Sequence, residues 1–155
     1  MKQVRADEQS VVFQLSSSER DALIQILQTY PAMPAGPYGG SKERNNPQAA
    51  EYQRLLDEAL AEKRAAHKRH LDAWLAAPDR FHKTKAGCRL TLERADSEWL
   101  LQVLNDIRVG HWLELGSPEV GELKPARLAE KAITTWLAME MSGFFQMSIL
   151  EAFDC

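Results

Sequence analysis

The stretch CRLTLERADSEWLLQVL, residues 88–104, combines the pattern of a strand with the pattern of a helix. Apolar and polar side chains alternate from Cys88 to Leu92, as they do in a strand with one buried face. Asp96 and Ser97 then offer a helix start, and apolar residues follow at helical spacing up to Leu104. These residues predict a strand that is followed directly by a helix.

The same plan occurs once more, 77 residues earlier in the chain. Val11–Leu15 alternates, Ser16–Glu19 supplies capping hydroxyls and a first-turn carboxylate, and Pro31 ends the helix. The identical pairs are Leu15 and Leu92, Leu23 and Leu100, Gln25 and Gln102, and Leu27 and Leu104. We predict a duplicated strand-helix unit at 10–30 and 88–115, with the strands paired and both helices on one face. The alternative is that two amphipathic units look alike because they share a periodicity.

The remaining segments predict a loop and two more helices. Pro and Gly residues are frequent at 31–47, which is typical of a loop. A long helical pattern covers 48–77, and a C-terminal helix covers 125–153. The predicted fold is mainly α (α+β), a helical bundle with a small two-stranded sheet built from the duplicated strand-helix unit. With 155 residues, the chain predicts a single domain over 1–155.

Composition excludes several classes of protein. With 45% hydrophobic and 26% charged residues, the chain is neither intrinsically disordered nor a disulfide scaffold. The net charge of −3 is unevenly distributed, because residues 63–89 hold eight Lys and Arg against two Asp. That segment therefore carries +6, and the rest of the chain carries −9.

The location that we expect is cytoplasmic. The N-terminus is polar and has no secretory pattern, and Cys88 and Cys155 are predicted to be reduced, without a metal or redox role. We expect no cofactor. The apolar segment 132–150 contains one charged residue, Glu140, and predicts a central helix or a helix shared with a second copy in a homodimer, not a membrane span.

The basic segment is the first candidate functional surface. It predicts contacts with a protein partner or, as the alternative, with a nucleic-acid backbone. A metal site at His67, His70 and Asp72 is disfavoured because neighbouring cations oppose a divalent ion. The candidate residues are Lys63, Arg64, His67, Lys68, Arg69, His70, Arg80, Lys83 and Lys85.

A polar cluster follows in the second unit. Arg108 lies on the apolar side of the predicted helix, so we predict that it is buried and paired with Glu140. Asp106 and His111 lie nearby, which leaves open a small enzyme with a site around Arg108, His111 and Glu140. Such a site would lack a nucleophile. In the proline-rich loop, Tyr38 is a candidate partner contact.

The second unit resembles an uncharacterised, mostly actinobacterial protein family with a WL..LND.R...G..L stretch. Trp99-Leu100, Leu104–Asp106, Arg108, Gly110 and Leu113 carry the resemblance, together with Trp136-Leu137. The similarity covers about residues 10 to 28 and 90 to 150. It implies a cytosolic single-domain bacterial protein of unknown function in a family of which some members are labelled as regulators, and it identifies no active site.

These observations favour a non-enzymatic protein-interaction or regulatory module. No complete catalytic set is present in the sequence, and the Met-rich C-terminal helix is more apolar than a small core requires. The alternatives are a nucleic-acid-binding regulator that acts through 63–89 and the small enzyme described above.

Overall fold

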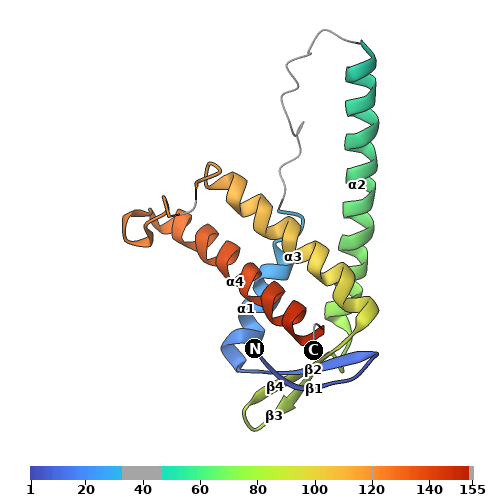
Figure 1. Ribbon diagram of the computed structural model, residues 1–155, viewed down its shortest axis with the longest axis vertical. Helices are drawn as coiled ribbons and strands as arrows, with labels where there is room; N and C mark the ends of the chain where they lie inside the picture. The colour runs from blue at the N-terminus through green and yellow to red at the C-terminus, as the bar shows by residue number, and fades with distance from the viewer. Residues whose placement is uncertain (33–46, 120, 154–155) are drawn as a thin grey trace.

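The computed structural model describes residues 1–32, 47–119 and 121–153 (Figure 1). A small antiparallel sheet lies at one end of the molecule, and helices lie on one face of it. The strands are β1 (Lys2–Ala6), β2 (Ser10–Leu15), β3 (Phe81–Thr84) and β4 (Gly87–Glu93), in the order β1-β2-β4-β3. The helices are α1 (Ser17–Gln28), α2 (Pro47–Ala76), α3 (Arg94–Glu114) and α4 (Glu130–Phe153), with a 3-10 turn at Pro125–Arg127.

The two central strands pair with each other. β2 and β4 are antiparallel, with Val11 opposite Leu92 and Leu15 opposite Cys88. Alternate residues of both strands are buried under the helices, and the residues between them face outward. The sequence pattern therefore predicted the strands that carry the buried face of the sheet.

The sheet has four strands, so the prediction of two strands was wrong. β1 pairs with β2 and β3 pairs with β4, which places both additional strands at the edges. All five residues of β1 are exposed, and β3 is only four residues long. Because edge strands are short and polar, they lack the alternating apolar pattern by which a strand is recognised in a sequence.

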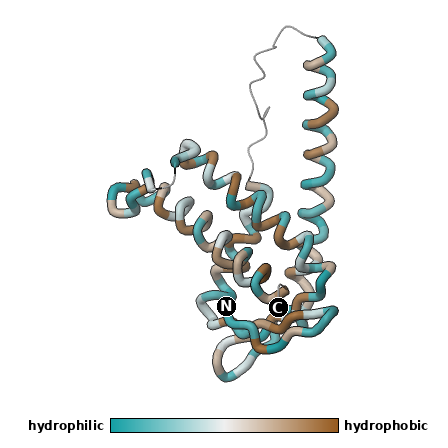
Figure 2. The backbone as a smooth tube through the Cα atoms, in the orientation of Figure 1, coloured by the Kyte–Doolittle hydropathy of each residue, from teal (hydrophilic) through white to brown (hydrophobic). Residues whose placement is uncertain are grey.

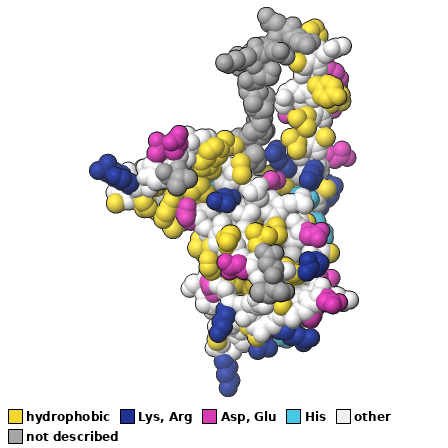
Figure 3. Space-filling model, viewed as in Figure 1, with side chains coloured by type: hydrophobic (Ala, Val, Ile, Leu, Met, Phe, Trp, Pro, Cys, Tyr) yellow, Lys and Arg dark blue, Asp and Glu magenta, His cyan; other side chains and the backbone are white. Residues whose placement is uncertain are grey.

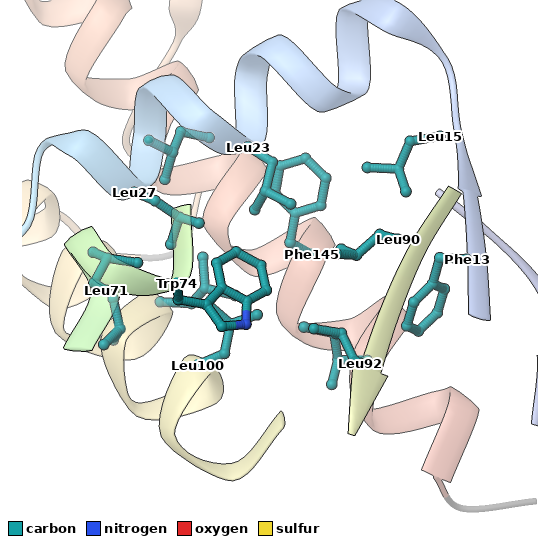
Figure 4. Close-up of a cluster of buried hydrophobic side chains, with 14 of the residues drawn as sticks. Phe13, Leu15, Leu23, Leu27, Leu71, Trp74, Leu90, Leu92, Leu100 and Phe145 are labelled. Atoms are coloured by element: carbon teal, nitrogen blue, oxygen red, sulfur yellow. The ribbon is translucent and has the colours of Figure 1, made fainter. Parts of the chain in front are cut away.

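The core lies between the sheet and the helices. Figure 4 shows how side chains from every layer meet there, including Phe13 and Leu92 of the sheet and Trp74 of α2. α3 and α4 run antiparallel and pack along each other (Figure 1). A capping box between Ser16 and Glu19 starts α1, and the Glu19 carboxylate also pairs with the N-terminal amine.

Much of α2 extends away from this core (Figure 1). Among its 30 residues, only Leu71 and Trp74 are buried, and both lie in its last two turns. Hydrophilic and hydrophobic residues alternate along the projecting part (Figure 2), where Tyr52, Leu55 and Leu56 are exposed. The helix begins and ends one residue before the predicted range of 48–77.

The C-terminal helix also differs from its prediction. α4 begins at Glu130, whereas the sequence pattern placed the start at residue 125. Pro125 instead opens the separate 3-10 turn. Within the described ranges, the length and apolarity that a membrane-crossing helix needs are not met by any helix.

Candidate functional site

A cleft between α2 and α3 brings together two buried polar atoms without a partner among the described residues and several charged side chains. Its volume is about 480 Å³. Side chains that are three or four positions apart on α2 face similarly spaced side chains of α3 across the cleft. The lining residues are Tyr30, Leu60, Lys63, Arg64, His67, Leu101, Gln102, Asn105 and Asp106. We refer to this site as the α2–α3 cleft.

Tyr30 forms the inner wall of the α2–α3 cleft. It follows α1, is only 2% exposed, and its hydroxyl has no hydrogen-bond partner within the described part of the chain. Burial and the nearby Asp106 carboxylate raise the pKa of Tyr30 to about 12, against the opposing effect of Arg64. The phenol is therefore held neutral, and its hydroxyl remains able to donate a hydrogen bond.

His67 lies beside Tyr30, with 6.5 Å between the ring centroids. Its Nδ1 atom is buried and makes no hydrogen bond to a described residue. Burial and the charge of Lys63 lower the pKa of His67, while Asp106 acts in the opposite direction. Two adjacent ring systems thus present unsatisfied polar atoms in one cleft.

The pKa of Tyr30 predicts a loss of stability at alkaline pH. In the unfolded chain the phenol ionises near pH 10, so between about pH 10 and pH 12 only the unfolded state loses its proton. The free energy of unfolding should fall by about 2 kcal/mol across that window. Urea unfolding at about pH 8 and about pH 11.5 measures the change.

Two phenylalanine variants isolate this effect from other alkaline titrations. Tyr30→Phe should remove most of the loss of stability between about pH 10 and pH 12. Tyr52→Phe, at an exposed position on α2, should show the same loss as the wild type. Equal alkaline losses in Tyr30→Phe and in the wild type would show that the buried phenol is not responsible.

A second cleft, of about 620 Å³, lies between α3 and α4. Two tryptophans and three charged residues face it. The lining residues are Asn105, Arg108, Val109, Trp112, Pro118, Glu119, Gly121, Leu123, Trp136, Met139 and Glu140. We refer to this site as the α3–α4 cleft.

The prediction of a buried pair between Arg108 and Glu140 was wrong. Both residues are exposed at the α3–α4 cleft, and no ion pair joins them. A Cβ atom at Gly143 would lie 3.6 Å from Arg108 Nε. Arg108 therefore lies beside Gly143 of α4, and its side chain is exposed to solvent.

The other candidate residues of this helix do not join Arg108. His111 Nδ1 lies 3.5 Å from Glu114 Oε2, and His111 lines neither cleft. Asp106 faces the α2–α3 cleft instead. The residues of the enzyme hypothesis are therefore divided between separate places.

The basic segment is also divided. Lys68 pairs with Asp72 on α2. Arg80 Nη1 lies 3.0 Å from Asp96 Oδ2, and the Arg80 guanidinium stacks 4.5 Å from the centre of the Trp74 ring. Figure 3 shows Lys and Arg side chains (dark blue) at several separate places on one face of the molecule.

The other basic candidates have different surroundings. The His70 ring contacts Trp99, with 4.4 Å between their centroids. Arg69, Lys83 and Lys85 are exposed. Lys63, Arg64 and His67 line the α2–α3 cleft together with Asp106, and Arg108 and Glu140 both line the α3–α4 cleft.

Sequence reasoning missed Tyr30, Gln102 and Asn105 of the α2–α3 cleft. Tyr30 precedes Pro31, which indicated only the end of a helix. Gln102 and Asn105 lie in an ordinary amphipathic helical pattern, where polar residues are expected. It also missed Asp96 as a polar centre, which accepts hydrogen bonds from Trp74 Nε1 and Arg80. Tyr38 lies outside the described residues.

Comparisons with other proteins add no further site. Nor do the described residues include a group of three His, Cys, Asp or Glu side chains placed to hold a metal ion. The resemblance to the actinobacterial family stays an expectation from the sequence. No family model, curated protein or solved structure matches this chain.

Proposed function

We propose that this protein is an interaction module that forms a homodimer through its C-terminal helix. The supporting observation is a set of large apolar side chains that α4 exposes to solvent. Leu137, Phe144, Met147 and Leu150 are between 41% and 55% exposed. We call these four residues the α4 outer face.

The α4 outer face has the character of a protein interface. From 132 to 150 the helix carries one charged residue, Glu140, and depletion of charge is typical of interface centres. Hydrophobic side chains (yellow) gather over α3 and α4 on the visible side of the molecule (Figure 3). Exposed large apolar side chains of this kind favour association over exposure to water, and the exposed Glu140 lies among them.

An apolar groove borders the α4 outer face. It has a volume of about 540 Å³ and lies between α1 and α4. Ala22 and Ile26 form one wall, and Leu137, Ala138 and Met141 form the other. A partner that covers the α4 outer face would extend its apolar contacts into this groove.

A second copy of α4 is the occupant that fits best. Twofold interfaces use the same surface on both subunits, so the surface must be complementary to itself. The four residues of the α4 outer face extend from 137 to 150, so the outer faces of two copies can cover each other along the helix.

Sedimentation of matched lysine variants tests the dimer. The wild type should sediment as a dimer at about 100 µM, and Met147→Lys should weaken the dimer by about 30-fold or more, because a charge enters an apolar interface. Leu55→Lys is the control, since Leu55 is 50% exposed and Met147 is 55% exposed, but Leu55 lies on the projecting part of α2. Circular dichroism confirms that both variants are folded.

Two results would contradict the proposal. A monomeric wild type at about 100 µM would leave the α4 outer face without a second copy. If Leu55→Lys dissociated the dimer and Met147→Lys did not, the contact would lie on α2. The nucleic-acid and enzyme hypotheses receive less support, because the residues on which each depends are dispersed.

The duplication of the strand-helix unit is a separate proposal about the origin of the fold. Phe13 pairs with Leu90 in the sheet, and these two residues are 77 positions apart, as the aligned units require. A local twofold axis through this pair would exchange β2 with β4 and α1 with α3. The register of the central strands is consistent with such an exchange.

A further inference from the structure

We propose that the α2–α3 cleft binds a small organic phosphate, with the phosphate at Lys63 and Arg64 and a hydroxyl of the ligand at Asp106. This site is separate from the α4 outer face, and it does not depend on dimer formation. It uses residues that the proposed interaction function leaves unexplained.

The charges that line the cleft favour an anion. Lys63 and Arg64 come from adjacent positions of α2, and the third basic group, His67, lies one turn further along. Asp106 is the only carboxylate among the lining residues. Lys63 and Arg64 carry +2 and Asp106 carries −1, so the lining has a net positive charge that favours a phosphate monoester, whose charge is close to −2 at neutral pH.

Unsatisfied polar atoms indicate that a ligand with several hydrogen-bonding groups fits the same space. The Tyr30 hydroxyl and His67 Nδ1 are buried and make no hydrogen bond to a described residue, although the Asp106 carboxylate is close enough to raise the pKa of Tyr30. Buried polar groups are nearly always hydrogen-bonded, so such atoms require an explanation. A ligand that reaches the inner wall would satisfy His67 Nδ1, and its hydroxyl would lie between the Tyr30 hydroxyl and the Asp106 carboxylate.

The α2–α3 cleft is too large to be filled by inorganic phosphate alone. A volume of about 480 Å³ lies in the range of small-molecule sites. Leu60 and Leu101 add apolar walls, and Gln102 and Asn105 add amides that can donate and accept. Together these groups suit a phosphorylated polyol or sugar better than inorganic phosphate.

Extended nucleic acid is a poorer match for the same chemistry. A backbone that continued along α2 would next meet Lys68, which is paired with Asp72. Further along the chain, Arg80 is held by Asp96 and Trp74. Lys63, Arg64 and His67 are grouped at the cleft and do not form a continuous track with Lys68 and Arg80.

Calorimetric titration with three matched probes tests the ligand class. Ribose 5-phosphate should bind the full-length protein at least about 10-fold more tightly than inorganic phosphate, and ribose should show no measurable binding. Equal affinity for inorganic phosphate and ribose 5-phosphate would overturn the role of Asp106. Equal affinity for ribose and ribose 5-phosphate would overturn the role of the cations.

Two lysine variants with the same change of charge locate the site. Lys63→Gln should weaken binding of ribose 5-phosphate by about 10-fold or more, because it removes a charge-assisted contact. Lys83→Gln, on the exposed edge strand β3, should change the affinity by less than about twofold. Equal losses in the two variants would show non-specific attraction and overturn the proposal.

The titration of His67 supplies a readout that a purely structural role would not change. In the free protein, burial, Lys63 and His70 hold the pKa of His67 below its usual value, and Asp106 opposes them. A bound phosphate beside His67 should raise this pKa, which a proton NMR titration with and without ribose 5-phosphate measures. No shift on saturation would place the phosphate elsewhere. The same titration on Met147→Lys separates ligand binding from self-association.

Discussion

Phe145→Ala should lower the free energy of unfolding by about 3–5 kcal/mol, whereas Phe144→Ala should lower it by less than about 1 kcal/mol. Phe145 is fully buried in the core, and its neighbour Phe144 is 41% exposed on the α4 outer face. Removing the buried ring loses its transfer free energy and leaves a cavity between the sheet and the helices. At the exposed position, water fills the space that the ring leaves.

The two phenylalanine variants share residue type, helix and substitution, so their difference reports burial alone. Both should be compared by urea denaturation in the Met147→Lys background, because dimer formation would otherwise add to the stability of the wild type. The Phe144 ring also contacts Phe145, at 5.3 Å between centroids, which accounts for a small residual loss. Similar losses in the two variants would contradict the placement of Phe145 in the core.

Gly87→Ala should destabilise the fold by about 3 kcal/mol or more. Gly87 opposes Thr84 at the turn between β3 and β4 and has a φ angle of +126°. A Cβ atom built there would lie 2.1 Å from the backbone oxygen of Leu15, the last residue of β2. The side chain would therefore strain its own backbone and also force the ends of two central strands apart.

Gly116→Ala is the matched control for Gly87→Ala. Gly116 also has a positive φ, +87°, but nothing lies within 4 Å of a Cβ atom at that position. The loss of folding free energy in Gly116→Ala should be limited to the backbone strain, about 1–2 kcal/mol. Thermal unfolding of both variants measures the difference, and equal melting temperatures would rule out the close approach of Gly87 to Leu15.

Patterns within single segments allowed much of the fold to be predicted. Alternation in Val11–Leu15 and Cys88–Leu92 identified the two strands whose inner faces are buried, and their pairing followed from the need to cover both. β1 and β3 were missed because an edge strand is defined by hydrogen bonds to its neighbour. These bonds are made by the backbone and produce no recognisable side-chain pattern in the sequence. The number and the positions of the edge strands could be determined only from the assembled sheet.

The error at Arg108 has a related cause. The helical pattern of α3 shows which side of the helix is apolar, but it does not show what the facing helix offers at each position. The Arg108 side chain lies beside Gly143 of α4 and is exposed at the α3–α4 cleft, so no buried partner is needed.

The α2–α3 cleft was predictable only in part. Lys63, Arg64 and His67 were identified because they are basic and close in sequence, and Asp106 because it lies in a polar cluster. Tyr30 carried no signal, since a tyrosine before a proline is ordinary at the end of a helix. These residues meet only because α1, α2 and α3 converge on one space.

By itself, the sequence determined the periodicity of the central strands and main helices, the charge of the basic segment and the apolar character of α4. These properties depend on residues a few positions apart, where side-chain directions follow directly from backbone geometry. Only the tertiary structure decided that Arg108 reaches solvent and that Tyr30, His67 and Asp106 share a cleft. Such contacts join segments tens of residues apart, and they depend on which helix faces pack together.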